Sequence, residues 1–126
     1  MQLMEGYYMF EDSFGNDDHL DLCFIVEGKS DKEKLKPIVP THATILCTNG
    51  TISEDDLLDL VEPYDMYELI TLFDADKNGG KLRKLMRKVY PEAIQIEIPM
   101  NYKEVAETPT HILKELLKKQ KIKVND

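Results

Sequence analysis

Short apolar runs alternate with amphipathic stretches along most of this chain. The runs are rich in β-branched and large apolar residues and stop abruptly at polar or glycine positions, which is typical of buried parallel strands. They cover residues 22–26, 43–47, 68–73 and 93–98. Strands that alternate with helices through short connections form a mainly parallel sheet. The pattern therefore predicts an α/β fold of the Rossmann-like type, with about four strands and helices on both faces.

The intervening stretches carry recognisable helix start and stop signals. Four helices are expected: one over residues 32–39 capped by Ser30 or Asp31 and weakened by Pro37, one from Ser53 to Pro63, one over residues 78–90, and one from Thr108 or Thr110 to about Gln120. The helix over residues 78–90 is the clearest, because Leu82, Leu85 and Met86 recur at helical spacing. Pro91 ends it.

Residues 1–20 show no sustained period and contain five acidic residues without any Lys or Arg. We interpret them as a loosely ordered acidic extension, and residues 21–126 as one domain, a size that can bury a single core. No apolar run approaches the roughly 20 residues that span a bilayer. Cys23 and Cys47 lie in apolar runs, as reduced core thiols do. The sequence thus favours a cytoplasmic protein without a membrane partner.

The net charge of −8 argues at first against a nucleic-acid partner, because phosphate contacts require Lys and Arg. The charge is unevenly distributed, however. Residues 37–76 contain nine acids and no Lys or Arg, whereas the basic residues gather in residues 29–36, 77–88 and 114–123. A chain polarised in this way can still present a local phosphate-binding face.

Three acidic residues directly follow two of the predicted strands. Glu27 ends the first strand, and Asp74 and Asp76 end the third. Open α/β sheets place their sites at the carboxyl ends of strands, and carboxylate oxygens are the ligands that Mg²⁺ prefers. We therefore expect these three side chains to gather around one Mg²⁺ ion, for which Mn²⁺ could substitute.

Two other interpretations of the Asp74-x-Asp76 pattern fit the sequence less well. An EF-hand calcium loop that starts at Asp74 requires Glu at its twelfth position, which is Leu85 here, and requires a helix where a strand is predicted. A haloacid-dehalogenase-type phosphatase would use Asp74 as its nucleophile, but it normally carries the motif on its first strand and adds a paired acidic motif downstream. No such pair follows Asp76.

Taken in order, the motifs resemble the Toprim domain, which topoisomerases, bacterial primases, OLD-type nucleases and ribosomal-RNA maturases share. The resemblance covers about residues 21–120. Its three motifs are matched by Glu27-Gly28-Lys29-Ser30-Asp31, by Thr48-Asn49-Gly50, and by Asp74-Ala75-Asp76-Lys77-Asn78-Gly79 with the trailing basic residue Arg83. Ala75 departs from the Pro or Gly of many members.

The resemblance implies a function and a set of site residues. Asp74 and Asp76 would hold Mg²⁺, Glu27 would act as general acid or base or as a third ligand, and Arg83 would join the catalytic group. Substrate contacts would come from Gly28, Lys29, Asp31, Asn49, Gly50, Lys77, Gly79 and Lys81. The implied activity is nuclease or RNA-maturation chemistry on RNA or DNA phosphodiesters.

Two alternatives remain open. The small size of the chain favours a non-catalytic nucleic-acid or protein binding module of a DNA- or RNA-processing complex, such as one in repair, and a homo-oligomer would enlarge its binding surface. A small-molecule phosphatase is the third class. The C-terminal lysines are interpreted as favourable charge at a helix C-terminus, with contact to a nucleic-acid backbone as the alternative, and the three histidines as surface or loop residues.

Overall fold

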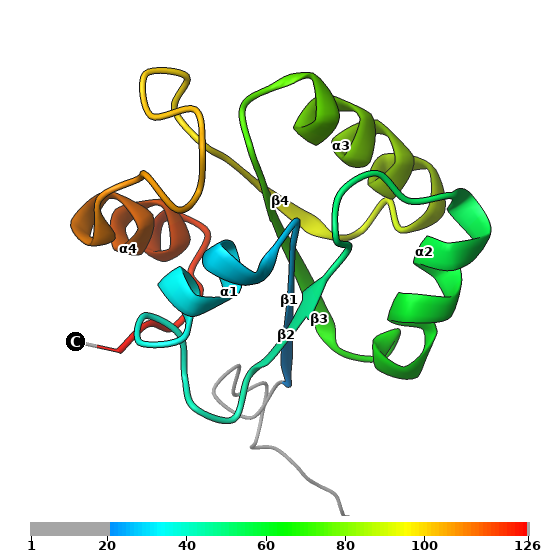
Figure 1. The fold of residues 1–126 in the computed structure, drawn as a ribbon. Coiled ribbons are helices and arrows are strands. Elements are labelled where there is room, and N and C mark those ends of the chain that lie inside the picture. Colours follow the sequence, from blue (N-terminus) through cyan, green and yellow to red (C-terminus); the bar gives the residue numbers. More distant parts are fainter. Residues whose placement is uncertain (1–20, 126) are drawn as a thin grey trace, which may run out of the picture.

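The computed structural model describes residues 21–125, which form one α/β unit (Figure 1). The expectation of a loosely ordered extension at residues 1–20 lies outside the described residues. The elements in chain order are β1 (Leu22–Val26), α1 (Lys29–Leu35), β2 (Thr44–Cys47), α2 (Glu54–Val61), the 3₁₀ helix η3 (Glu62–Tyr64), β3 (Glu68–Phe73), α3 (Lys77–Val89), β4 (Ile94–Glu97) and α4 (Thr110–Lys119).

The four strands form one sheet in the order β2-β1-β3-β4, and every neighbouring pair is parallel. The chain leaves β1 towards β2 on one side and leaves β3 towards β4 on the other. β1 and β3 are therefore adjacent strands whose connections diverge, and such a switch point leaves a crevice at the carboxyl ends of the strands. Both strand ends singled out in the sequence belong to this pair.

Helices cover both faces of the sheet, as predicted. Figure 1 shows α1 and α4 on one face and α2 and α3 on the other. Because alternate residues of a strand point to opposite faces, β1 contributes to two cores. Phe24 and Val26 pack in a cluster with Leu113 and Leu117 of α4, whereas Cys23 and Ile25 pack in a second cluster with the apolar stripes of α2 and α3.

Two predicted helix starts are wrong. α1 begins at Lys29 rather than Lys32 and ends at Leu35, before Pro37. Neither Ser30 nor Asp31 precedes it. The residue before α4 is Pro109, while the Thr108 hydroxyl donates a hydrogen bond to the Glu104 carbonyl at 2.8 Å. Both threonine caps fail because Thr108 is engaged by the preceding loop and Thr110 is already helical.

The start of α2 is confirmed, since the Ser53 hydroxyl accepts a hydrogen bond from the Asp56 N–H at 3.1 Å. The strand over residues 68–73 is also confirmed without change. No helix within residues 21–125 has the length and apolar character required to cross a membrane.

Candidate functional site at the carboxyl ends of β1 and β3

The two predicted acidic strand ends meet. Glu27 follows β1 and Asp74 follows β3, and the Glu27 Oε2 atom accepts a hydrogen bond from the Asp74 N–H at 2.6 Å. These residues are 47 positions apart in the chain. The parallel pairing of β1 with β3 brings them to the same edge of the sheet. The chain after β3 is therefore joined directly to the carboxylate after β1.

The turn that carries Asp74 and Asp76 is held by the start of α3. Asp76 caps this helix, because its Oδ1 atom accepts a hydrogen bond from the Gly79 N–H at 2.8 Å. A Cβ atom at Gly79 would collide with the Asp74 carbonyl. The motif glycine is thus required for close packing of the helix against the turn, and not for a left-handed backbone.

Arg83 holds the same turn from the next turn of α3. Its Nη1 atom donates a hydrogen bond to the Asp74 carbonyl oxygen at 2.9 Å. The Arg83 carbonyl in turn accepts from the Gln95 side chain at 3.0 Å, and Gln95 accepts from the buried Thr71 hydroxyl at 3.1 Å. The structure therefore gives Arg83 a positioning contact with the turn, and its predicted catalytic role stays a prediction.

The loop between β4 and α4 also touches the acidic turn. The Val105 N–H donates to the Asp74 Oδ1 atom at 2.8 Å, and the Ala75 N–H donates to the Lys103 carbonyl at 2.6 Å. The Ala106 N–H forms a further backbone hydrogen bond with the carboxylate of Asp31. This loop could not be recognised from the sequence, because its contacts are made by backbone N–H and C=O groups, which every residue type except proline provides.

Glu27, Asp31, Asp74 and Asp76 together form what we call the acidic group. Asp31 is its most buried member, with 5% of its surface exposed. Its Oδ2 atom accepts a hydrogen bond from the Gly28 N–H at 3.0 Å, which closes the turn after Glu27. Together with its bond from Ala106, this contact makes Asp31 a link between the first motif and the β4–α4 loop.

The second motif supports the backbone of Glu27. The N–H groups of Asn49 and Gly50 both donate to the Glu27 carbonyl, at 2.7 and 3.2 Å. Both residues have a positive φ, 61° and 95°, which Asn and Gly adopt more readily than other residues. Their predicted contact with a substrate stays a prediction.

The acidic group is electrostatically strained. Burial is the main cause that raises the pKa values of Glu27, Asp31 and Asp74. The charge of Asp74 raises the pKa of Glu27 and of Asp31 further, and Asp76 acts on Glu27 and Asp74 in the same direction. Among residues 21–125, no Lys or Arg forms a salt bridge with these carboxylates. Such a cluster is suited to a cation.

The fit to Mg²⁺ can be tested on this geometry. The hydrogen bonds described above engage one oxygen each of Glu27, Asp74 and Asp76. Within the described part of the chain, no three His, Cys, Asp or Glu side chains are arranged so that they could hold one ion together. Mg²⁺ is usually bound by one or two carboxylates with waters and substrate phosphates, so the donor set fits the ion without a complete triad. The three-carboxylate arrangement stays a prediction.

Exposed lysines surround the acidic group. Lys29 is the first residue of α1, and Lys77 and Lys81 lie in the first turns of α3. These three predicted substrate contacts therefore lie on helices that begin at the carboxyl edge of the sheet, and their contact with a substrate stays a prediction. The three lysines are exposed, whereas Asp31 is buried and the other members of the acidic group are half-buried.

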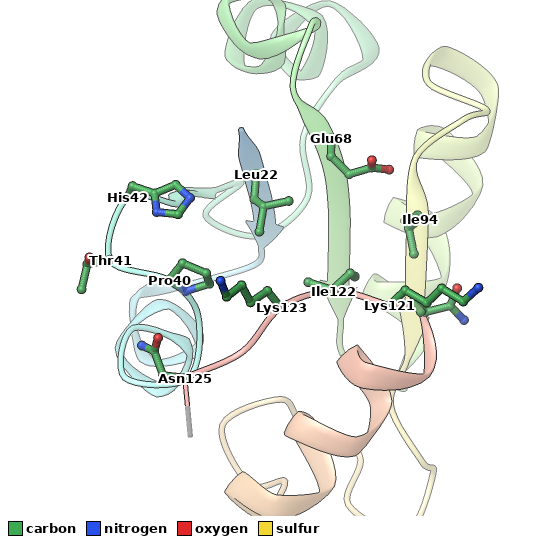
Figure 2. A pocket seen from close by; sticks show the side chains of 11 residues that line it. Leu22, Pro40, Thr41, His42, Glu68, Ile94, Lys121, Ile122, Lys123 and Asn125 are labelled. Atoms are coloured by element: carbon green, nitrogen blue, oxygen red, sulfur yellow. The ribbon is translucent and has the colours of Figure 1, made fainter. Parts of the chain in front are cut away.

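A cavity of about 490 Å³ lies at the opposite edge of the sheet. Figure 2 shows that its lining comes from the amino ends of β1, β3 and β4, through Leu22, Glu68 and Ile94, and from the C-terminal tail, including Lys121 and Lys123. None of the predicted site residues lines it. The acidic group and this cavity are therefore separate features.

Cys23, His42 and His111 lie away from the acidic group, whereas the Cys47 thiol donates a hydrogen bond to the Gly28 carbonyl beside it at 3.5 Å. Burial raises the pKa of Cys23 to about 12, so this thiol stays protonated in the core. Cys47 is half-buried, and both cysteines are free. His42 and His111 are exposed, as predicted, and His19 lies outside the described residues.

An α/β unit with an acidic site at its strand switch point is the arrangement expected of a Toprim domain. A small Toprim domain protein from Bacillus stearothermophilus matches with a TM-score of 0.78 and 37% sequence identity, over 85% of this chain and 91% of that one. The chain therefore belongs to the small Toprim domain proteins. The fold class and the family that the sequence analysis predicted are confirmed.

Two curated relatives extend this comparison. The uncharacterized protein YusF of Bacillus subtilis (strain 168) is 39% identical over 108 residues, which are 86% of this chain and 74% of YusF. Ribonuclease M5 1 of Ligilactobacillus salivarius (strain UCC118) is 35% identical over 68 residues, which are 53% of this chain but only 36% of that protein. No family model matches the chain.

Proposed function

We propose that this protein is a Mg²⁺-binding Toprim protein that cleaves or processes nucleic-acid phosphodiesters, with RNA as the preferred substrate. One observation carries the proposal: Glu27 and Asp74 from adjacent strands meet at the switch point, with raised pKa values and without a salt-bridge partner among the described residues. The 68-residue similarity to ribonuclease M5 1 supports RNA over DNA.

Each residue has a distinct role in this proposal. Asp74 and Asp76 would hold Mg²⁺, which when bound supplies positive charge that stabilises the leaving oxygen of a phosphodiester. Glu27 would transfer the proton, and its raised pKa brings it closer to neutral pH, where general acid and base catalysis is most effective. Lys29, Lys77 and Lys81 would bind substrate phosphates.

A second candidate is a binding module without catalysis. It is supported by the Glu27 carboxylate, whose Oε2 atom accepts the Asp74 N–H at 2.6 Å and so holds the turn after β3, a structural role that requires no catalysis. Both candidates predict metal binding, and only the first predicts cleavage that depends on Glu27.

Metal binding is tested by titration of Mn²⁺ and Mg²⁺ into the wild type, into the double variant Asp74→Asn, Asp76→Asn, and into Glu115→Gln. Asn keeps a hydrogen-bond acceptor at both positions and is itself a good helix cap, so the turn should remain folded. Glu115 is an exposed acid on α4 and serves as the matched control. We expect binding to be lost only in the double variant. Absence of wild-type binding at millimolar metal would contradict both candidates.

Cleavage is tested on structured RNA and on single- and double-stranded DNA with Mn²⁺, with the wild type beside Glu27→Gln. The enzyme proposal predicts cleavage by the wild type and a loss of about 100-fold or more in the variant, the usual contribution of a general acid or base. Metal binding together with no Glu27-dependent cleavage would establish the binding module instead.

A further inference from the structure

We propose that residues 99–103 grip the substrate strand at an unpaired base, with Lys103 on a phosphate and Met100 on the face of that base. This inference rests on the proposed function, because it assumes that the acidic site receives a nucleic acid. It adds a substrate class, a strand with at least one unpaired nucleotide, and two contact residues outside the three sequence motifs.

The segment is fixed to the acidic turn by its backbone. Ala75, which lies between Asp74 and Asp76, donates its N–H to the Lys103 carbonyl at 2.6 Å. Within the segment, the N–H groups of Tyr102 and Lys103 donate to the Pro99 carbonyl at 3.0 and 3.2 Å. Tyr102 also packs against the core cluster beneath α4. In Figure 1 the yellow-to-orange loop that contains this segment stands beyond the carboxyl ends of the strands.

Lys103 has the position and freedom of a phosphate-binding residue. Its backbone is in the left-handed region at φ 65°, which is uncommon for Lys and here accompanies the two contacts to Pro99 and Ala75. Its side chain is exposed and forms no salt bridge within the described residues. Lys29 and Lys77 border the acidic group from α1 and α3, and Lys103 adds a positive charge from the β4–α4 loop.

Met100 is a large apolar side chain that is 84% exposed three residues before Lys103. Single exposed apolar residues are ordinary on protein surfaces, so its placement on a fixed loop beside the site is what matters. Methionine is flexible and polarisable, and it is among the apolar side chains that insert between base steps and contact the faces of bases. Insertion into an intact duplex would have to unstack its bases, whereas an unpaired nucleotide offers its face without that cost, so the proposed contact is with an unpaired nucleotide.

The chain provides a matched control. Met66 is 91% exposed and lies just before β3, at the opposite edge of the sheet from the acidic group. Met66→Gln and Met100→Gln therefore make the same chemical change at equally exposed positions, and only one of them touches the proposed strand path.

The experiment measures dissociation constants for a single-stranded RNA and for a fully paired RNA of equal length, with Mg²⁺ and in the Glu27→Gln background that leaves the RNA intact. We expect Met100→Gln to weaken single-strand binding about fivefold, at the low end of a base-stacking contact, and to leave duplex binding unchanged. Met66→Gln should change neither. Lys103→Gln should weaken both and reduce the salt slope by about one.

Each other result has a clear meaning. Equal single-strand affinity for Met100→Gln and its parent would overturn the base contact, and equal losses on both RNAs would overturn the requirement for an unpaired nucleotide. An unchanged salt slope in Lys103→Gln would overturn the phosphate contact. If the parent binds neither RNA, the proposed function itself fails and this inference is overturned with it, whereas the losses in the Met100 and Lys103 variants are compared only when the parent binds. Thermal unfolding of each variant confirms that it is folded.

Discussion

At the scale of single residues, Gly79 and Gly80 are neighbours in α3 with different surroundings. A Cβ atom at Gly79 would collide with the Asp74 carbonyl, whereas at Gly80 its nearest neighbour would be the tip of Arg83 at 3.6 Å, an ordinary contact. Gly79 is therefore fixed by packing against the acidic turn. Gly80 carries only the usual penalty of glycine inside a helix.

The two glycines should respond to the same substitution in opposite directions. We expect Gly79→Ala to lower the free energy of unfolding by about 1–3 kcal/mol, because backbone must move to admit the methyl group. Gly80→Ala should raise it by about 0.5–1 kcal/mol through helix propensity. Urea unfolding of both variants measures the difference, and equal effects would show that the helix does not pack on the turn as described.

Glu27 gives a pH-dependent prediction. Its pKa in the folded protein is raised above the ordinary value of 4.5, mainly by burial and then by the charges of Asp74, Asp76 and Asp31. The stabilising contribution of the protonated group is therefore complete below pH 4.5 and is lost as the pH rises through the folded-state pKa. Above that value, the charged Glu27 destabilises the folded state.

Glu27→Gln should therefore unfold at higher urea concentration than the wild type at pH 7 in the absence of divalent metal. The advantage should shrink as the pH falls towards 4, where the wild-type carboxyl is itself protonated. Mg²⁺ should also reduce it, since a bound cation stabilises the charged form. A constant difference between the two proteins across this pH range would show that the charge of Glu27 is not the cause.

Single-residue predictions from sequence were accurate for the acidic strand ends. Glu27 and Asp74 could be placed together because each ends a buried apolar run and parallel strands share a carboxyl edge. The contact between Lys103 and Ala75 could not be predicted, because the Lys103 carbonyl makes it and every residue type has a carbonyl. Asp31 was recognised as a site residue by its motif, but nothing in the sequence indicated its hydrogen bond with the Ala106 N–H.

At the scale of elements, the helices differ in how they begin. α2 and α3 begin at side-chain caps, Ser53 and Asp76, whereas α1 and α4 follow Gly28 and Pro109 without one. From the sequence, Ser30 or Asp31 was expected to cap α1. In the structure Asp31 lies inside the helix and binds the Gly28 N–H from there, so the helix starts earlier.

Replacing two serines tests this assignment. Ser53→Ala should lower the free energy of unfolding by about 1 kcal/mol, the usual effect of losing an N-cap. Ser30→Ala should change it by less than about 0.5 kcal/mol, because Ser30 is exposed and caps nothing. Denaturant unfolding followed by circular dichroism compares the two. A larger effect at Ser30 would restore the start expected from the sequence.

Element boundaries were predicted well where one strong signal acts alone. β3 is a continuous apolar run bounded by acids, and its limits match the structure. The start of α4 was missed because neither threonine caps it: the Thr108 hydroxyl donates to the Glu104 carbonyl four residues earlier, and Thr110 already lies in the helix. Where several residues could cap a helix, the conformation of the preceding loop decides, and the sequence pattern does not show it.

At the scale of the whole molecule, the charge distribution favours the carboxyl edge of the sheet as the place where a polyanion would bind. Residues 37–76 contain nine acids and no Lys or Arg, while Lys29, Lys77, Lys81 and Lys103 lie around the acidic group at the carboxyl edge of the sheet. A polynucleotide approaching a protein of net charge −8 should therefore bind at this edge and should need a divalent cation to offset the carboxylates.

Two lysines test this orientation. Lys81→Gln should weaken RNA binding and reduce the slope of log K against log salt by about one, because one phosphate contact is lost. Lys119→Gln removes an equally exposed charge at the end of α4 and should leave the slope unchanged. Equal slopes for the two variants would place the nucleic acid elsewhere. Filter binding between about 50 and 200 mM salt covers the range in which the slope is measurable.

The α/β class and its layers followed from the alternation of elements. The strand order could not be predicted from that alternation. β1 pairs with both β2 and β3, although β3 is more than forty residues away in the chain. Apolar runs of similar composition do not indicate which will be central. The order depends on how the crossover helices pack on the two faces.

The central position of β1 has a consequence for synthesis on the ribosome. Its partner β3 is translated later, and the contact between Glu27 and Asp74 spans 47 residues. At about 5–20 residues per second, the nascent chain presents Cys23–Val26 without this neighbour for roughly 2–10 seconds. This apolar strand is then a natural target for chaperones. The contact between Glu27 and Asp74, and with it the acidic group, cannot form before that interval ends.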